Sequence, residues 1–351
     1  MAYNIKDVAA RAGVSPSTVS RVISGSPRIS QKTRERVFAV MKELDYHPNA
    51  IARSLVKQSS EALGILIPST VEQFFLNPFF PEVLRGITQV AQRTGYDLML
   101  STALHGLNDA ERLERMIRSR RVDGVILLTS RVKDNLLPVL DANRIPAVLI
   151  GRPMEETSVS WVNNDNVRAA YDITAHLLNL GHRRVGFIGG SQEFVVTIDR
   201  LNGYRMALEE FGIPFDPQLV VAGEFMEEVG YSGMMRLLAL AERPGAVVAS
   251  DDVLAFGAMR AAGELGYRIP EDMSIAGFND IPLARLANPP MTTVNVRIYE
   301  LGQTAARLLI EQMENNTLQS RSVEIGHSLV VRRSCGAWDP LLPYQAAPLH
   351  P

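Results

Sequence analysis

Hydrophobic and polar positions in residues 4–23 follow a helical repeat that is interrupted once. Asn4 is placed to cap the first helix, and Gly13 follows it, where a left-handed residue most easily ends a helix. Ser15 and Pro16 then suit the start of a second helix. The apolar residues at helical spacing are Ile5, Val8, Ala9, Ala12, Val19, Val22 and Ile23. This pattern predicts a helix-turn-helix, whose second helix enters the major groove of DNA, with two packed helices of another small bundle as the alternative.

The second helix leaves polar residues pointing outward, and these are the candidate DNA contacts. Base contacts are expected from Pro16, Ser17 and Arg21, with Arg21 best suited to the edge of a guanine. Contacts that position the phosphate backbone are expected from Tyr3, Asn4, Ser15, Thr18 and Ser20.

A third amphipathic helix is expected over residues 31–45, and a short helix restarts after it at Pro48. The residue before a proline is pushed out of the helical region, so His47 separates the two. Isolated helices below about 12–15 residues rarely hold in water, so the segment 48–57 is marginal alone. We expect it to form when two copies pack together on DNA; a plain linker helix is the alternative.

From Glu61 onward, continuous apolar runs alternate with amphipathic segments, as in folds with buried parallel strands. The expected strands are 63–67, 97–101, 124–128, 147–150, 185–188, 219–221, 246–249, 274–277, 292–294 and 327–331. The expected helices are 79–94, 109–120, 134–142, 167–180, 200–211, 227–241, 253–265 and 299–315. Two such series imply two doubly wound α/β lobes rather than one sheet.

Charge is distributed unevenly along the chain, although the net charge is only −2. Residues 1–60 contain ten Lys and Arg against four Asp and Glu, so the remainder is acidic. A basic head on an acidic body places a polyanionic partner, double-stranded DNA, at the N-terminus, and binding should weaken steeply with salt. The single cysteine, Cys335, excludes an internal disulfide and fits a reducing cytoplasm. No apolar run approaches the roughly 18 residues of a membrane span and no secretory leader is visible, so we expect a cytoplasmic protein without membrane contact.

Enzyme chemistry needs a constellation of residues that the sequence does not contain. The six histidines lack the spacing of metal ligands, and one cysteine cannot build a structural zinc site. Residues 186–190 lack the spacing of a dinucleotide-binding loop, and Gly189-Gly190 is expected to let a strand turn tightly. We therefore expect no catalytic residue, metal or cofactor; a hydrolase is the alternative.

Two α/β lobes suit a small molecule held between them, at the carboxyl ends of the strands. Polar or aromatic residues that follow strands and suit a sugar are Asn77, Phe79, Thr129, Arg200, Phe225, Asp251, Asn279 and Asp280. Arg200 stands out, because a guanidinium fork can bridge two neighbouring hydroxyls; an ordinary ion pair with Asp199 is the alternative. Some phenylalanines of residues 74–80, Phe80 among them, are expected to pack the next helix against its sheet instead of contacting the ligand.

Three motifs resemble the lactose-repressor (LacI/GalR) family of transcriptional regulators. They are Ile5-Lys6-Asp7-Val8-Ala9, Val14-Ser15-Pro16-Ser17-Thr18-Val19-Ser20-Arg21-Val22 and Leu44-Asp45-Tyr46-His47-Pro48-Asn49-Ala50-Ile51-Ala52-Arg53-Ser54-Leu55. The resemblance implies that residues 48–57 form a hinge helix, with Ala52 and Leu55 at the minor groove and Leu55 as the apolar wedge. Asn49 is expected to contact DNA as well. It also implies that Arg200, Asp251 and Asn279 contact the effector and that Phe225 packs on it. Two departures, Asp251 where Asn is usual and Gly151-Arg152 where an Asp often stands, leave the identity of the effector open.

The resemblance further implies how the chain divides, with lobes of periplasmic-binding-protein type. Residues 1–47 would form the helix-turn-helix head-piece and 48–60 the hinge. Residues 61–161 with 290–322 would form the first lobe, 162–289 with 323–338 the second, and 339–351 a flexible tail.

Within the family, residues 76–87 and 194–204 are similar to maltose-operon repressors of Gram-positive bacteria. The function expected from all of this is a homodimeric repressor of a near-palindromic operator, released by a small sugar, with maltose or a maltodextrin favoured. A regulator that uses a co-repressor or a phosphorylated carrier protein is the alternative. A sugar-transport component would share the two lobes but has no use for the basic head.

Overall fold

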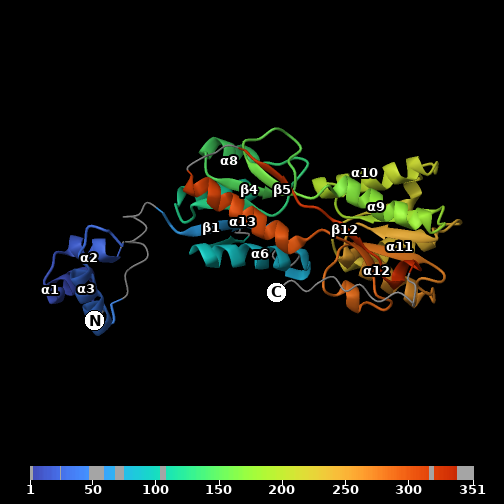
Figure 1. The fold of residues 1–351 in the computed structure, drawn as a ribbon. Coiled ribbons are helices and arrows are strands. Elements are labelled where there is room, and N and C mark those ends of the chain that lie inside the picture. The colour runs from blue at the N-terminus through green and yellow to red at the C-terminus, as the bar shows by residue number, and fades with distance from the viewer. Residues whose placement is uncertain are drawn as a thin grey trace. The chain divides into compact units, whose positions relative to one another are not determined.

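The computed structural model describes residues 3–23, 25–46, 59–67, 75–102, 108–315 and 320–337. They belong to two compact units, Met1–Ala62 with Arg120–Asp123, and Leu63–Ser119 with Gly124–Pro351. Figure 1 shows the fold and labels helices and strands of both units where there is room.

The first unit contains the helix-turn-helix that the sequence predicts. Helix α1 spans Ile5–Ala12, α2 spans Pro16–Ile23 and α3 spans Gln31–Glu43. Asn4 caps α1 in a capping box with Asp7, and Gly13 ends it with a φ of 63°. The three helices enclose a small core of Val8, Ala9, Ala12, Val19, Val22, Val37, Val40 and Met41.

The end of α3 differs from the expectation, and two other expected segments lie outside the described residues. Helix α3 ends at Glu43 rather than at residue 45, because Leu44 and Asp45 already leave the helical conformation and Asp45 has a φ of 48°. The expected hinge helix, with Asn49, Ala52 and Leu55, and the expected tail 339–351 lie outside the described residues.

The second unit is built on two sheets, each with six strands among the described residues. The first has the order β11-β5-β4-β3-β1-β2. Its strands are β1 (Ala62–Leu66), β2 (Asp97–Ser101), β3 (Gly124–Leu127), β4 (Ala147–Ile150), β5 (Ser160–Asn163) and β11 (Ser322–Glu324). Its helices are α6 (Phe79–Thr94), α7 (Asp109–Arg118), α8 (Leu137–Asn143) and α13 (Ile298–Glu314). We call this sheet with its helices the N-lobe.

The second sheet has the order β12-β10-β9-β8-β6-β7, with β12 antiparallel to β10. Its strands are β6 (Val185–Gly189), β7 (Val220–Ala222), β8 (Ala246–Ala249), β9 (Ser274–Asn279), β10 (Thr292–Asn295) and β12 (Ser328–Val330). Its helices are α9 (Asn166–Asn179), α10 (Val195–Glu210), α11 (Glu227–Leu238) and α12 (Asp252–Glu264), and 3-10 turns cover Pro217–Leu219, Ala284–Leu286 and Arg333–Cys335. We call this part the C-lobe. The parallel pairing within each sheet confirms the expected doubly wound lobes.

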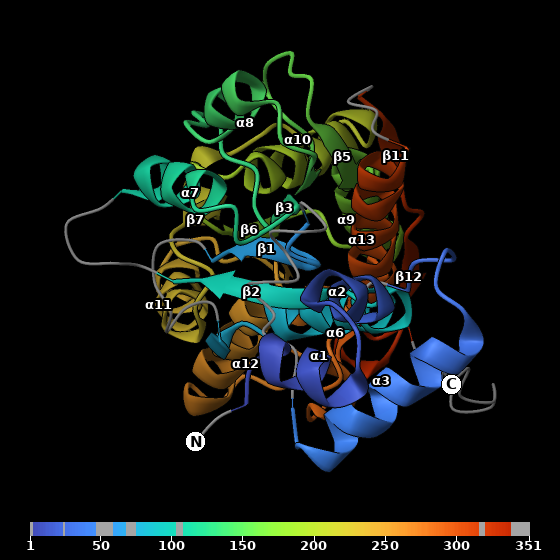
Figure 2. The ribbon, with the colours of Figure 1, turned by 90° about the vertical axis from the view of Figure 1, so that its left-hand side faces the viewer.

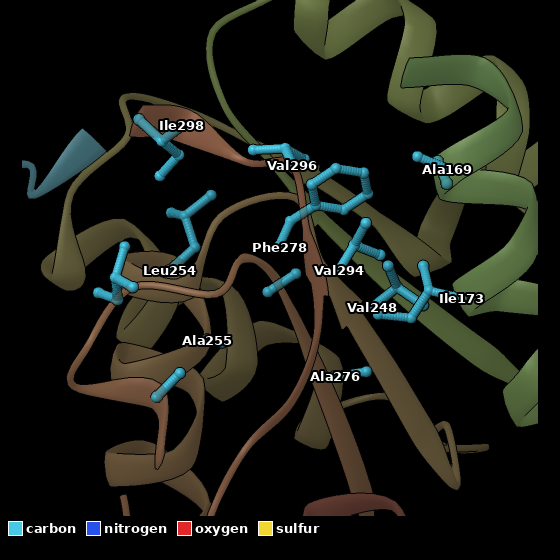
Figure 3. Packing of buried hydrophobic residues seen from close by; sticks show 14 of the residues in the cluster. Ala169, Ile173, Val248, Leu254, Ala255, Ala276, Phe278, Val294, Val296 and Ile298 are labelled. Atoms are coloured by element: carbon cyan, nitrogen blue, oxygen red, sulfur yellow. The ribbon is translucent and has the colours of Figure 1, made fainter. Parts of the chain in front are cut away.

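Helices distant in sequence pack closely on these sheets. In the N-lobe, α13 lies beside α6 (Figure 2), and a Cβ on Gly86 would lie 2.2 Å from the carbonyl oxygen of Tyr299. A Cβ on Gly302 would likewise lie 2.2 Å from the carbonyl oxygen of Val83, so the two glycines allow the two helix backbones to meet. In the C-lobe, Figure 3 shows Ile173 of α9 turned toward Val248 of the sheet, inside the buried core.

The chain passes between the lobes later than expected at each crossing. Strand β10, expected in the first lobe, pairs with β9 and β12 in the second sheet. The connecting segments therefore follow β5, β10 and β11, and the buried Asn164 donates both amide hydrogens across them. Its Nδ2 lies 3.1 Å from the carbonyl oxygen of Val296 and 2.8 Å from that of Ile325.

Two helices begin away from their expected positions, for local reasons. Helix α10 starts at Val195 rather than at residue 200; its cap residue, Phe194, has no side-chain oxygen, and the Val195 N–H donates to the carbonyl of Ser130 in the N-lobe. Helix α8 starts at Leu137 rather than at residue 134, because Asp134 accepts from the backbone of Leu136 and Leu137 instead of entering the helix. Among the described helices, none is long and apolar enough to cross a membrane.

Candidate ligand cavity and DNA-binding surface

A cavity of about 150 Å³ lies between the N-lobe and the C-lobe. The N-lobe contributes residues that follow its strands or lie at or just before the start of α6, namely Asn77, Phe79, Thr129, Ser130, Gly151 and Arg152. The C-lobe contributes Asp199, Arg200, Glu224, Phe225, Asp251 and Asn279. Both sets include residues at the carboxyl ends of parallel strands, which is where α/β sheets hold their ligands.

Seven of the eight side chains chosen from the sequence line this cavity, and Asp280 does not. The carboxylate of Asp280 accepts hydrogen bonds from Arg332 Nη2 at 2.7 Å and from Asn295 Nδ2 at 3.0 Å. Asn279 and Asp280 have φ angles of 107° and 56°, an unusual pair for residues other than glycine. This backbone turn sends neighbouring side chains to different partners, which is why proximity in sequence misled the choice of Asp280.

Arg200 is buried and its guanidinium is held on every side. Nε donates to Asn166 Oδ1 at 3.0 Å, Nη1 donates to the carbonyl of Ser250, and Nη2 lies 3.4 Å from Asn279 Oδ1. The guanidinium also lies 3.8 Å from the centre of the Phe278 ring. Burial lowers the pKa of Arg200 to about 10, against the opposing effect of nearby carboxylates, so the group stays charged at neutral pH.

Asp251 joins the two walls of the cavity. Its Oδ2 accepts from Asn279 Nδ2 at 2.8 Å and from Asn77 Nδ2, in the N-lobe, at 3.3 Å. Its Oδ1 accepts from the Val253 N–H at 2.6 Å and so caps α12. Burial raises the pKa of the Asp251 carboxyl, although these hydrogen bonds and Arg200 oppose the rise.

Sequence reasoning missed a second contact between the walls. Arg152 forms a bidentate ion pair with Asp199, with Nε 2.9 Å from Oδ2 and Nη2 2.5 Å from Oδ1. Asp199 therefore pairs with Arg152 of the N-lobe, and not with Arg200 as the alternative had it. The available signal was the departure at Gly151-Arg152, which places an arginine two residues after β4.

Aromatic side chains complete the cavity. A Cβ on Gly190 would lie 2.1 Å from Cζ of Phe225, so the glycine makes room for this ring. Phe79 and Phe80 meet edge to face at 5.4 Å, and both pack against the core while also lining the cavity. The packing role expected for Phe80 is therefore shared by Phe79.

The expected DNA contacts lie on α2 and in the residues just before α1 and α2. Pro16, Ser17 and Arg21 are exposed, while Thr18 and Ser20 are half-buried. Tyr3 is 53% exposed. Two of the expected phosphate contacts also stabilise the helices, because the Ser15 hydroxyl accepts from the Thr18 N–H at 3.1 Å and the Asn4 side chain accepts from the Lys6 N–H at 2.8 Å.

Metal chemistry has no candidate among the residues that the structure describes, where no group of three His, Cys, Asp or Glu side chains could hold an ion.

Comparison with known proteins assigns a family to each of the two parts of the chain. Residues 4–49 match the family of bacterial regulatory proteins of the lacI type, and residues 174–335 match a periplasmic binding protein-like domain. The transcriptional regulator CelR of Thermobifida fusca is 36% identical over 329 residues, which are 93% of this chain and 96% of CelR. The chain belongs to the LacI family.

Other relatives and two solved structures are similar over nearly the whole chain. The repressor CytR of Escherichia coli strain K12 is 34% identical over 96% of this chain and 97% of CytR. MalR of Streptococcus pneumoniae serotype 4 is 36% identical over 90% of this chain and 94% of MalR. A CelR–cellobiose complex has a TM-score of 0.74 at 35% identity, covering 95% of this chain and 99% of that one. A lac repressor dimer bound to operator and an anti-inducer has a TM-score of 0.81 at 26% identity, with the same two coverages.

This LacI-family regulator matches CelR and MalR at equal identity, so the resemblance to maltose-operon repressors is not a specific one. The family assignment confirms the expected fold, a helix-turn-helix head-piece with two parallel α/β lobes, and the expectation that the protein is not an enzyme.

Proposed function

We propose that this protein is a sugar-responsive repressor that binds a near-palindromic operator as a homodimer. The observation that carries the proposal is a cavity between two lobes, lined by aromatic and polar side chains, in a chain whose first unit is a helix-turn-helix. The regulator would act in the cytoplasm, where its operator is.

Helix α2 supplies the contacts to DNA in this proposal. Pro16, Ser17 and Arg21 lie exposed on it and would read base edges, while Tyr3, Asn4, Ser15, Thr18 and Ser20 would hold the phosphates. The lac repressor dimer that is similar to this chain is bound to its operator, which supports a twofold arrangement and a palindromic site. Ala52 and Leu55 would add the minor-groove contacts of a hinge helix, and Asn49 a further contact to DNA.

A neutral sugar suits the chemistry of the cavity. Phe79 and Phe225 offer flat apolar faces for the C–H groups of a sugar ring, and Asn77, Asp251 and Asn279 offer partners for hydroxyls. Cellobiose is bound in the similar CelR structure, and maltose or a maltodextrin remains the effector favoured by the resemblance of residues 76–87 and 194–204. Asp280 would support the cavity through Arg332 rather than touch the sugar.

Effector binding would change the angle between the lobes and separate the paired hinge helices, which lowers operator affinity. A co-repressor, or a phosphorylated carrier protein, would act on the same angle between the lobes but would raise operator affinity instead of lowering it.

A ligand screen followed by an operator titration tests the proposal. Maltose, maltotriose, cellobiose and glucose are screened by thermal shift on the full chain, because a ligand that binds only the folded state raises the melting temperature. Any hit is then added to a titration of an operator selected from random DNA. Release of the operator supports the proposal; tighter binding identifies a co-repressor, and equal binding with and without every sugar contradicts it. Arg200→Ala should abolish the thermal shift while leaving DNA binding intact.

A further inference from the structure

Both arginines that line the cavity are already hydrogen-bonded to other groups of the protein. Two arginines, Arg152 and Arg200, lie among three carboxylates, those of Asp199, Glu224 and Asp251. The positions of their hydrogen bonds determine which charge a ligand meets.

Arg200 is committed to the protein. Its donors meet Asn166 Oδ1, the carbonyl of Ser250 and Asn279 Oδ1, and one face of the guanidinium lies over Phe278. A ligand can reach this cation only in competition with those partners.

Arg152 is committed to Asp199. Gly151, with a φ of 110°, turns the chain at the end of β4, and the carbonyl of Arg152 is held by the Ser130 hydroxyl. The guanidinium then reaches the C-lobe, where its Nε and Nη2 both donate to the Asp199 carboxylate. The Arg152 side chain is 36% exposed and that of Asp199 is 3% exposed, so removing Asp199 would leave a cation on the cavity wall.

The acidic groups are less fully compensated. Asp251 accepts only from amide and backbone N–H groups, and Glu224 is exposed at the cavity. An anionic ligand would meet these carboxylates without a free arginine to offset them, whereas hydroxyl groups can donate to them.

We propose that this cavity selects uncharged ligands and rejects phosphorylated sugars, and that Asp199 sets this selectivity by occupying Arg152. The inference rests on the proposed function, because it names the charge class of the effector for the same cavity. Asp199 acts here as a specificity-determining residue, through Arg152.

Binding is measured by isothermal titration calorimetry on the full chain. The probes are the neutral sugar found by the screen, or maltose if there is none, then glucose 6-phosphate and inorganic phosphate. Wild type should bind the phosphorylated probes at least about tenfold more weakly than the neutral sugar. Asp199→Asn should bind these probes at least about tenfold more tightly than wild type does, because the substitution removes a like charge and releases the Arg152 guanidinium.

Two variants make the gain specific. The double variant Arg152→Met with Asp199→Asn has no guanidinium to release, so it should lose the gain. Glu193→Gln is the control. Glu193 pairs with Arg131 across the two lobes but does not line the cavity, so this variant should bind all probes as wild type does.

Each result decides. Wild-type binding of glucose 6-phosphate as tight as that of the neutral sugar overturns the inference while leaving a sugar-responsive repressor intact. A folded Asp199→Asn protein without the gain, or a double variant that keeps it, also overturns it. If wild type binds none of the probes but Asp199→Asn gains phosphate affinity, the role of Asp199 in rejecting anions holds and the sugar proposal fails. Should Asp199→Asn not fold, the wild-type comparison alone decides.

Discussion

Asn77 donates a hydrogen bond of 3.3 Å to Asp251 across the cavity, between residues 174 positions apart in the chain. The bond joins the N-lobe segment before α6 to the cap of α12 in the C-lobe. A carboxylate that is buried and still shared between two lobes makes the stability of the domain depend on pH.

Asp251→Asn is expected to change this pH dependence. Burial raises the pKa of the Asp251 carboxyl above its ordinary value of 3.8, so the folded state binds a proton more readily than the unfolded state. Its contribution to the free energy of unfolding therefore decreases as pH rises from the unfolded pKa through the raised folded pKa. The free energy of unfolding of both proteins is measured by urea denaturation between pH 4 and 7.5. As pH rises, the wild-type value should fall relative to the Asp251→Asn value. A difference that is constant over this range would contradict the argument.

Arg200→Lys keeps the charge but should not keep the function. A lysine cannot meet Asn166, the Ser250 carbonyl and Asn279 with the geometry of the guanidinium fork. We expect loss of about 2 kcal/mol in the free energy of unfolding, because hydrogen bonds to charged groups contribute about 1.5–3 kcal/mol each and one or more would be lost. Sugar affinity should fall as well. Denaturant titration and calorimetry measure the two effects, and unchanged values in both would contradict the role of the fork.

Gly190→Ala should weaken ligand binding by displacing an aromatic ring. Its Cβ would overlap Phe225, whose ring must then move into or away from the cavity. Strain of this kind typically costs about 1–3 kcal/mol, which corresponds to roughly five- to 150-fold in affinity if it falls on the bound state.

Gly263→Ala is the matched control for Gly190→Ala. Gly263 lies in α12, where a Cβ would meet nothing within 4 Å, so the change should stabilise the helix by about 0.5–1 kcal/mol and leave sugar affinity unchanged. Equal effects of the two substitutions on affinity would mean that the position of Phe225 is irrelevant.

Arg21→Ala should relax the sequence preference of DNA binding. Arg21 lies exposed on α2, and loss of a bidentate contact to a guanine typically costs about 1–3 kcal/mol of discrimination. Competition between the selected operator and random duplex DNA, at fixed salt, measures the specificity ratio. A uniform loss of affinity for both DNAs would instead identify Arg21 as a phosphate contact.

The fold could be predicted from the sequence because its signals are local. The stripe of Val8, Ala9 and Ala12, the Gly13 turn and the apolar runs of the strands depend on spacing alone. Residues that follow strands are brought together by the rule that ligands bind at the carboxyl ends of parallel strands, and seven of eight such choices line the cavity.

The rest could not be predicted because it depends on neighbours from the other lobe. The start of α10 relies on a bond to the Ser130 carbonyl, and the partner of Asp199 is an arginine 47 residues earlier in the chain. Nothing in the sequence of β10 indicates which of the two sheets it joins, and its membership in the second sheet follows only from its pairing with β9. Asp280 lies outside the cavity lining for a backbone reason, the left-handed turn at Asn279 and Asp280.

Asn164 ties together the three passages of the chain between the sheets, through its bonds to the carbonyls of Val296 and Ile325. Three connecting segments joined in this way cannot slide past one another without breaking a buried hydrogen bond, but they can bend together. We therefore expect relative motion of the two lobes to be a rotation about Asn164, that is, a change in the opening angle between them. A small ligand that changed this angle would displace the end of the N-lobe that lies farthest from the cavity.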